Sequence, residues 1–242
     1  MNAMTAVPVL PSVALMDWGR HALWAVVLVW ALLGVRQLLL SRTAPTGKRL
    51  GGLFAEMVGW LIGWQVAAAL LVLWTLWPGP ASPAFWLGLA FQSPSLVTGG
   101  LCIWMIARWS RPASPAQGFA QRTTAQRWLV FAGIALGWVL LLDTLAITHA
   151  VVPTSIYAWG FTPWPLWLLL ALSVLLWVVQ EKAIATIFIA TSALFMLARL
   201  PNGNIFDAVI DPWLWVALHG LLLSALRRRA LLRRKQQPLP AQ

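Results

Sequence analysis

The feature that most constrains the fold of this chain is a series of long apolar runs, separated by short polar or proline-containing stretches. Each run has about the 17 to 25 residues that a helix needs to cross a hydrocarbon core. Overall, 60% of the residues are hydrophobic and 10% are charged, against roughly 25% charged in a soluble domain. Because backbone groups in lipid must be satisfied within their own segment, runs of this length predict helices. We therefore predict an all-α, polytopic transmembrane bundle.

Seven spans account for these runs. Their predicted bounds are residues 21–40, 53–74, 84–107, 128–148, 163–179, 183–199 and 213–226. They form one transmembrane domain, residues 21–226, between an external segment, residues 1–20, and a basic cytoplasmic tail, residues 227–242. The stretches between spans are well below the roughly 50 residues of a small domain. We therefore expect no separate catalytic or ATP-hydrolysing domain.

The basic residues indicate the orientation, because cytoplasmic loops are rich in lysine and arginine. With the N-terminus outside and the C-terminus in the cytoplasm, all seventeen Lys and Arg residues except Arg20 and Arg199 fall on the cytoplasmic side. The weakest boundary is Gln180-Glu181-Lys182, which contains neither glycine nor proline. The sequence alone allows either a helical hairpin or one long helix at this boundary. Seven spans are preferred, because a single long helix would move the basic tail outside.

Eighteen tryptophans make the chain tryptophan-rich, and many lie near predicted span ends, for example Trp74 and Trp128. Tryptophan at span ends is typical of the aromatic belts at membrane interfaces. Local signals also mark where several helices begin. A capping residue precedes a proline at Ser82, Thr162 and Asp211, and Thr123-Thr124-Ala125-Gln126 fits a capping box.

Small residues predict close helix packing on two spans. Gly59 and Gly63 form a GxxxG motif on the second span, and Gly133 and Gly137 form another on the fourth. A contact between these two spans, within one chain or between chains, is one arrangement that the motifs allow. Motifs this short also arise often by chance.

The third predicted span is interrupted near its middle by Gln92 and Pro94. Proline removes a backbone hydrogen bond and clashes with the preceding turn, so a kink is expected here. Broken helices at this depth also form substrate sites in transporters. The matching break that an inverted repeat would supply is not evident in the sequence.

Ionisable residues collect on the predicted external half. Asp143 in the fourth span and His219 in the seventh lie at a similar predicted depth, where a lone carboxylate is costly. Nearer the external surface lie His21, His149, Arg199, Asp207 and Asp211. One alternative is an outward-facing site in which Asp143 orients His219 as a base or proton relay. The preferred alternative is a structural role for both residues.

No cofactor is expected, because the sequence contains no GxxxxGK, HExxH, GxSxG or CxxC motif. Haem b or a metal ion held by His21, His149 and His219 is the alternative, although no two of them have the i, i+4 spacing of a metal-binding helix. The expected partners are anionic lipids and other membrane subunits, not nucleic acid, since the basic residues flank apolar runs.

Three functions are compatible with these features. The first is a non-catalytic subunit or accessory factor of a bacterial inner-membrane complex for assembly, export or envelope biogenesis, because no energy-coupling domain or active-site motif is present. The second is a small transporter or proton-coupled carrier that uses the kinked third span and Asp143. The third is an integral-membrane enzyme on a lipid-linked substrate at the external leaflet, with Asp143 and His219 as acid and base. An enzyme is the less favoured class.

Overall fold

The computed structural model describes residues 11–42, 50–109, 123–147 and 154–236. Within these ranges the chain is helical and contains no strand, so the all-α prediction is confirmed. The elements are α1 (Val13–Arg42), α2 (Leu50–Leu76), α3 (Pro83–Ala90), α4 (Leu96–Trp109), α5 (Thr124–Thr144), the 3-10 helix η3 (Tyr157–Phe161), α6 (Trp164–Val178), α7 (Lys182–Ala198), α8 (Ile205–Val209) and α9 (Pro212–Gln236).

Two of the described helices are long and apolar enough to cross a membrane, over Val13–Leu39 in α1 and over Thr124–Thr144, which is α5. Among the shorter apolar helices, α4, α6 and α7 have 14, 15 and 17 residues. At 1.5 Å per residue these helices are about 21 to 26 Å long, less than a hydrocarbon core of roughly 30 Å. The two long helices indicate membrane association, and the number of spans stays a prediction.

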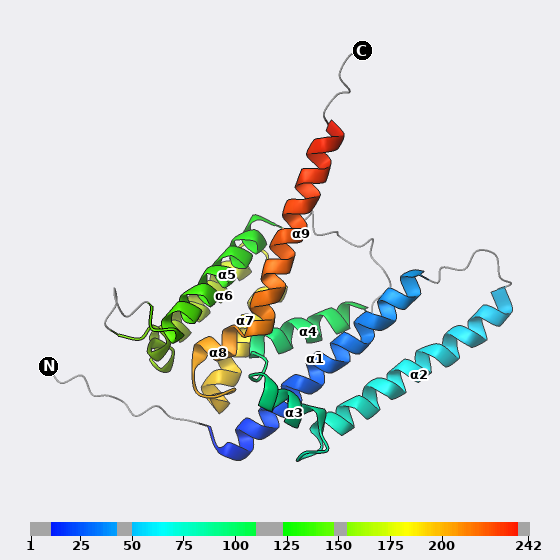
Figure 1. Cartoon of the computed structure of the whole chain (residues 1–242), viewed down its shortest axis with the longest axis horizontal. Coiled ribbons are helices and arrows are strands. Elements are labelled where there is room, and N and C mark those ends of the chain that lie inside the picture. The colour runs from blue at the N-terminus through cyan, green and yellow to red at the C-terminus, as the bar shows by residue number, and fades with distance from the viewer. Residues whose placement is uncertain (1–10, 43–49, 110–122, 148–153, 237–242) are drawn as a thin grey trace, which may run out of the picture.

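The helices pack in two groups that meet at α4 (Figure 1). α1 lies against α2, α3 and α4, while α6 packs on α7 and α5 packs on α9. α4 also contacts α7 and α8, and so joins the two groups. The buried apolar core lies at this junction and includes Leu96, Leu169, Ile187, Phe195 and Ile205.

Two helices extend beyond the predicted span ends. α1 begins at Val13, well before the predicted start at residue 21, and α9 continues through the predicted tail to Gln236. The length of an apolar run predicts only the part of a helix that lipid can cover. The helix itself can continue into polar sequence, because its backbone hydrogen bonds do not depend on apolar side chains. Figure 1 shows the C-terminal half of α9 extending past the other helices.

The predicted third span is two helices. α3 and α4 are separated by residues 91–95, which are not helical. Pro94 in this break is fully buried and Gln92 is exposed. A proline cannot donate a backbone hydrogen bond and disfavours helix at the residue before it, so the chain leaves the helix here. The predicted position is correct, but the interruption is a complete break rather than a kink.

The boundary that the sequence left open, Gln180-Glu181-Lys182, is a tight turn between α6 and α7. Gln180 adopts a left-handed conformation with φ 65°, and the Glu181 N–H donates to the Leu176 carbonyl at 2.8 Å. α6 and α7 then pack against each other. The structure is therefore a hairpin, and the single long helix is excluded.

Three of the four predicted N-caps are confirmed. Side-chain oxygens of Ser82, Thr123 and Asp211 accept backbone N–H groups in the first turns of α3, α5 and α9. The prediction is wrong at Thr162, whose hydroxyl donates to the Trp159 carbonyl. Thr162 thus closes η3, and α6 begins without a side-chain cap.

The glycines of α5 pack against α9. A Cβ atom at Gly137 would lie 2.2 Å from Trp215 Cδ1, and one at Gly133 would lie 2.6 Å from Leu218 Cδ1. A Cβ atom at Gly63 would have no neighbour within 4 Å in the described structure, and α2 packs on α1 and α3. In the described structure the α5 motif therefore packs on α9, and Gly63 takes no part in a contact between spans two and four. The surroundings of Gly59 lie outside the described residues.

Candidate functional site

Asp143 is buried at the C-terminal end of α5, where its carboxylate accepts hydrogen bonds. Its Oδ2 atom accepts from the Ser155 hydroxyl at 2.7 Å and from the Tyr157 N–H at 2.9 Å. Only 3% of the residue is exposed. The carboxylate that the sequence marked as costly is thus stabilised by the connection that follows its own helix.

Tyr157 links this carboxylate to a second one. Its hydroxyl donates to Asp207 Oδ2, and the Asn202 amide donates to the same oxygen. The Asn204 amide donates to the Tyr157 carbonyl at 2.9 Å. The structure therefore brings Asp143 and Asp207 into one network, which holds η3 against α8.

Tyr157 is the only tyrosine of the chain, so its ionisation can be followed alone by tyrosinate absorbance. Burial raises the pKa of Tyr157, and the hydrogen bond and charge of Asp207 raise it further. Because the pKa is higher in the folded than in the unfolded protein, protonated Tyr157 contributes to the stability of the fold. This contribution is complete below the ordinary pKa of about 10 and is lost as the pH rises through the folded-state pKa. We expect the folded protein to ionise well above pH 10 and the unfolded protein near pH 10.

Asp207→Asn should lower the midpoint of this titration but leave it above that of the unfolded protein, because burial remains. Asp17→Asn is the control, since Asp17 is exposed and lies on α1. A folded protein that titrates with the midpoint of the unfolded protein would contradict the prediction.

The structure does not bring His219 to Asp143. Gly137 faces Trp215 and Gly133 faces Leu218, so α5 and α9 run antiparallel. This register puts His219 level with Gly133, about ten residues from Asp143, or roughly 15 Å along the helix axis. The prediction of a common depth counted the residues between each side chain and the external end of its own predicted span. In this register α9 begins beside α5 about one turn before Asp143, close to the α3–α4 break.

His219 has different neighbours. Its Nδ1 atom donates to the Trp215 carbonyl at 2.9 Å. Its ring packs edge to face against Trp215 and Trp138, with centroid distances of 4.8 and 6.4 Å. These contacts stabilise the pair of α5 and α9 and fit the structural alternative.

The other predicted external residues are distributed over several elements. His21 is buried on α1, and its Nδ1 atom donates to the Asp17 carbonyl at 2.8 Å. Arg199 ends α7 in a left-handed conformation, with its guanidinium over the Phe195 ring. His149 lies outside the described residues. No group of three or more His, Cys, Asp or Glu in the described ranges could hold a metal ion.

Asp211 occupies the break between α3 and α4. Its Oδ2 atom accepts from the Ser95 N–H at 2.7 Å and from the Thr98 hydroxyl, and its Oδ1 atom accepts from the Leu214 N–H at 2.8 Å. One carboxylate thus caps α9 and binds the start of α4, whose own cap is the Ser95 hydroxyl that accepts from the Thr98 N–H at 3.0 Å; it lies at the positive ends of both helix dipoles. The sequence predicted only the cap on α9.

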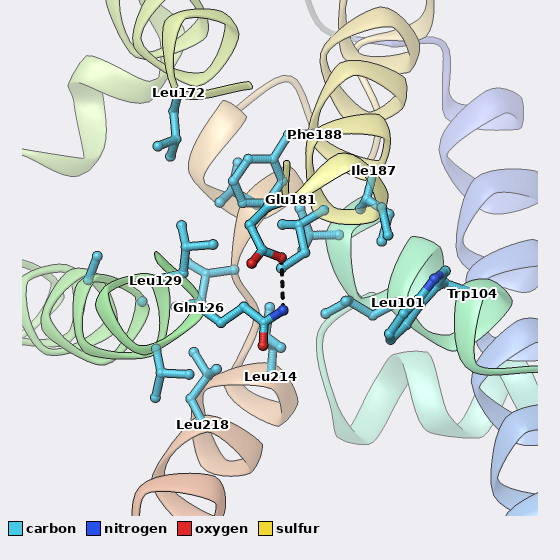
Figure 2. A pocket seen from close by; sticks show the side chains of 18 of the residues that line it. Leu101, Trp104, Gln126, Leu129, Leu172, Glu181, Ile187, Phe188, Leu214 and Leu218 are labelled. Atoms are coloured by element: carbon cyan, nitrogen blue, oxygen red, sulfur yellow. Dashed lines mark hydrogen bonds between the residues drawn. The ribbon is translucent and has the colours of Figure 1, made fainter. Parts of the chain in front are cut away.

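A cavity of about 650 Å³ lies between α4, α5, α6, α7 and α9. This volume is within the range of ligand sites. Most of the lining side chains are apolar, and Figure 2 shows Leu101, Leu129, Leu172, Phe188, Leu214 and Leu218 around the space. The polar lining residues lie where α4 ends, where α5 begins and where α6 turns into α7: Arg108, Thr123, Gln126, Gln180, Glu181 and Lys182.

Glu181 organises the polar end. The residue is 8% exposed, and its two carboxylate oxygens accept from the Thr123 hydroxyl and, at 2.8 Å, from the Gln126 amide. Figure 2 shows this last bond. The Gln126 side chain therefore binds Glu181, where a reciprocal capping box would have used the Thr123 N–H. These bonds tie the start of α5 to the turn between α6 and α7.

Two cations stand at the same end of the cavity. Arg108 and Lys182 are both exposed, and the Arg108 guanidinium lies 5.6 Å from the centroid of the Trp104 ring. Arg20 and Asp17 form the one ion pair between described residues, so neither cavity cation is paired there. Their charges are available to a bound molecule.

The sequence did not identify this site. The sequence predicts a helix boundary at Glu181 and a cap at Gln126, although Glu181 is the single acidic residue in the basic loops that the sequence assigns to the cytoplasm. That contrast was the one local signal. No protein family model, curated protein or solved structure matches this chain.

Proposed function

We propose that this chain is a multi-pass protein of the bacterial inner membrane that binds a lipid-like molecule and serves as a non-catalytic accessory factor of a membrane complex. The observation that carries this proposal is the polarity of the cavity. Its walls are apolar, and its charged and amide groups lie at one end. Such a site matches a molecule with one polar end and a long apolar body.

The dimensions of the cavity support an extended apolar ligand. On α5 the lining runs from Gln126 to Leu136, which is about 15 Å along the helix. The polar end adjoins the two segments that the sequence assigns to the cytoplasmic side, so the head of the ligand would face the cytoplasmic leaflet. Large apolar side chains exposed elsewhere, such as Leu168 and Leu197, support a lipid environment for the whole chain.

The lining supports binding over catalysis. The described cavity residues include no serine, cysteine, histidine or tyrosine, and their one hydroxyl, on Thr123, already caps α5 and donates to Glu181. Both oxygens of Glu181 already accept hydrogen bonds. Lipid-linked catalysis by Asp143 and His219 has less support, because the register of α5 and α9 offsets the two residues by roughly 15 Å along the helix axis.

Transport is the second candidate, and the break between α3 and α4 is the observation that favours it. The geometry supports it less than lipid binding. Asp211 occupies the N-terminus of α4, where a broken helix would present its dipole to a solute, and Asp143 accepts two hydrogen bonds.

The proposal can be tested by filling the cavity. Leu172 lines it, whereas Leu175, on the same helix, is 57% exposed and is not a lining residue. We expect wild-type protein, extracted in mild detergent, to retain lipid in native mass spectrometry. Leu172→Trp should lower lipid occupancy about tenfold or more, equivalent to about 1.4 kcal/mol. Leu175→Trp, with the same change in size, should retain it.

Equal lipid retention by Leu172→Trp and wild type, with both folded by circular dichroism, would contradict the proposal. A protein that co-purifies in place of lipid and is displaced by Leu172→Trp would also overturn it, because the cavity would then be a subunit-docking groove. Lipid lost from both tryptophan variants would show that the bound lipid lies elsewhere.

A further inference from the structure

We infer that the cavity selects a lipid with an anionic phosphate head over one with a zwitterionic head, and that Arg108 and Lys182 make this selection. The inference rests on the proposed function and specifies its ligand. Arg108 ends α4 and Lys182 begins α7, so two separate elements supply a cation to the same mouth.

The charge balance at the mouth favours an anion. Glu181 is the only acidic residue that lines the described cavity, and its carboxylate is buried against Thr123 and Gln126. The two cations are exposed and have no carboxylate partner among the described residues. A guanidinium can donate two N–H groups to one phosphate, and an ammonium adds a compact charge. A single phosphate can therefore use both side chains.

The surrounding surface has the same sign. Arg127 is exposed next to Gln126 at the start of α5, and α9 continues past the cavity with exposed Arg227 and Arg229. The positive field of these residues draws anionic lipid toward this face of the protein, while the choice between heads depends on the two cations that line the mouth. The field also opposes entry of a cationic head.

The position of Arg108 defines how a lipid would lie. Its guanidinium packs over the face of the Trp104 ring, one helical turn deeper on α4, and Leu101 lines the next level of the wall. A phosphate at Arg108 would thus sit at the rim, with the acyl chain directed along Trp104 and Leu101. Arg108 also covers the aromatic face on which a choline ammonium would bind. This geometry disfavours the zwitterionic phosphatidylcholine head.

The test uses the full chain, delipidated in detergent and offered equimolar phosphatidylglycerol and phosphatidylcholine with identical acyl chains. Native mass spectrometry then measures the ratio of the two bound lipids. We expect wild type to prefer phosphatidylglycerol about tenfold or more. The double variant Arg108→Gln with Lys182→Gln should bring this ratio near one, with total lipid occupancy within about twofold. Arg229→Gln, which removes an exposed arginine that does not line the cavity, should keep the wild-type ratio.

The outcomes separate the inference from the proposed function. A wild-type ratio near one, or a double variant that keeps the wild-type preference, would overturn the inference. If either occurs while Leu172→Trp still excludes lipid, the proposed function stands. If wild type binds neither lipid, both fail. A preference lost equally in Arg229→Gln would assign the selection to the general positive field and would also overturn the role of Arg108 and Lys182.

Discussion

Replacement of Asp211 by alanine is expected to lower the free energy of unfolding by about 3 kcal/mol or more. The carboxylate accepts hydrogen bonds from the Ser95 N–H, the Thr98 hydroxyl and the Leu214 N–H. Asp211 is 5% exposed, so water cannot readily replace these bonds. Each buried donor left without an acceptor costs about 1 to 3 kcal/mol. The variant also removes the N-terminal cap of α9 and the bonds that fix the first turn of α4.

The measurement is thermal unfolding in detergent followed by helical circular dichroism. A loss of about 3 kcal/mol corresponds to a fall in Tm of roughly 6 to 12 °C for a chain of this size. Asp17→Ala is the control, because its carboxylate is exposed and pairs only with Arg20 in the described residues; its effect should be within about 0.5 kcal/mol. Asp211→Asn keeps one carbonyl oxygen and should fall between the two. Equal Tm values for Asp211→Ala and Asp17→Ala would disprove that Asp211 stabilises the starts of α4 and α9.

Gly160→Ala should destabilise the protein by about 2 to 4 kcal/mol. An added Cβ atom would lie 1.9 Å from Oδ1 and 2.6 Å from Cγ of Asn204. The Asn204 side chain is fully buried; it accepts from the Phe206 N–H and donates to the Tyr157 carbonyl, both at 2.9 Å. It cannot move away without losing these bonds, so steric overlap adds to the cost of unpaired polar groups.

Gly63→Ala is the matched control for this prediction. The same added methyl group on α2 meets no atom of the described residues within 4 Å, and alanine favours a helix over glycine by about 0.5 to 1 kcal/mol. The control should therefore be neutral or slightly more stable. Asn204→Ala removes the obstacle, so Gly160→Ala should cost less in that background than in wild type. Equal costs of Gly160→Ala and Gly63→Ala would refute the close contact.

The helical class and most helix ends could be predicted because their causes are local. Ser82 and Thr123 cap helices through residues two and three positions ahead, and Pro94 breaks the third span through its own ring. The α6–α7 turn is also closed by a local backbone bond, from the Glu181 N–H to the Leu176 carbonyl, but no residue type signals it, because Gln180 adopts positive φ without being glycine. The Glu181 side chain that follows it bonds Thr123 and Gln126, more than fifty residues earlier, at the start of α5. Contacts of that separation are not readable from the sequence alone.

The site residues were harder to predict. Asp143 and His219 were paired by counting from span ends, which assumes that all helices end at one level. α9 begins deeper, where Asp211 reaches the α4 N-terminus, and the two residues are separated. The cavity was not predicted, because five helices contribute to it and no single one has a distinctive lining sequence. Only the polar network around Asp143 and Asp207 joins residues that the sequence had grouped on the external half.

The cavity also has a consequence for the order in which this protein matures. Leu214, Leu218 and Leu221 of α9 form part of its wall, while Arg108 and Gln126 come from the middle of the chain. During synthesis the early helices leave the ribosome first, and the wall stays open until α9 has joined them. Asp211 then secures both α9 and α4 in one step. The cavity therefore has its full wall only in a chain translated through α9.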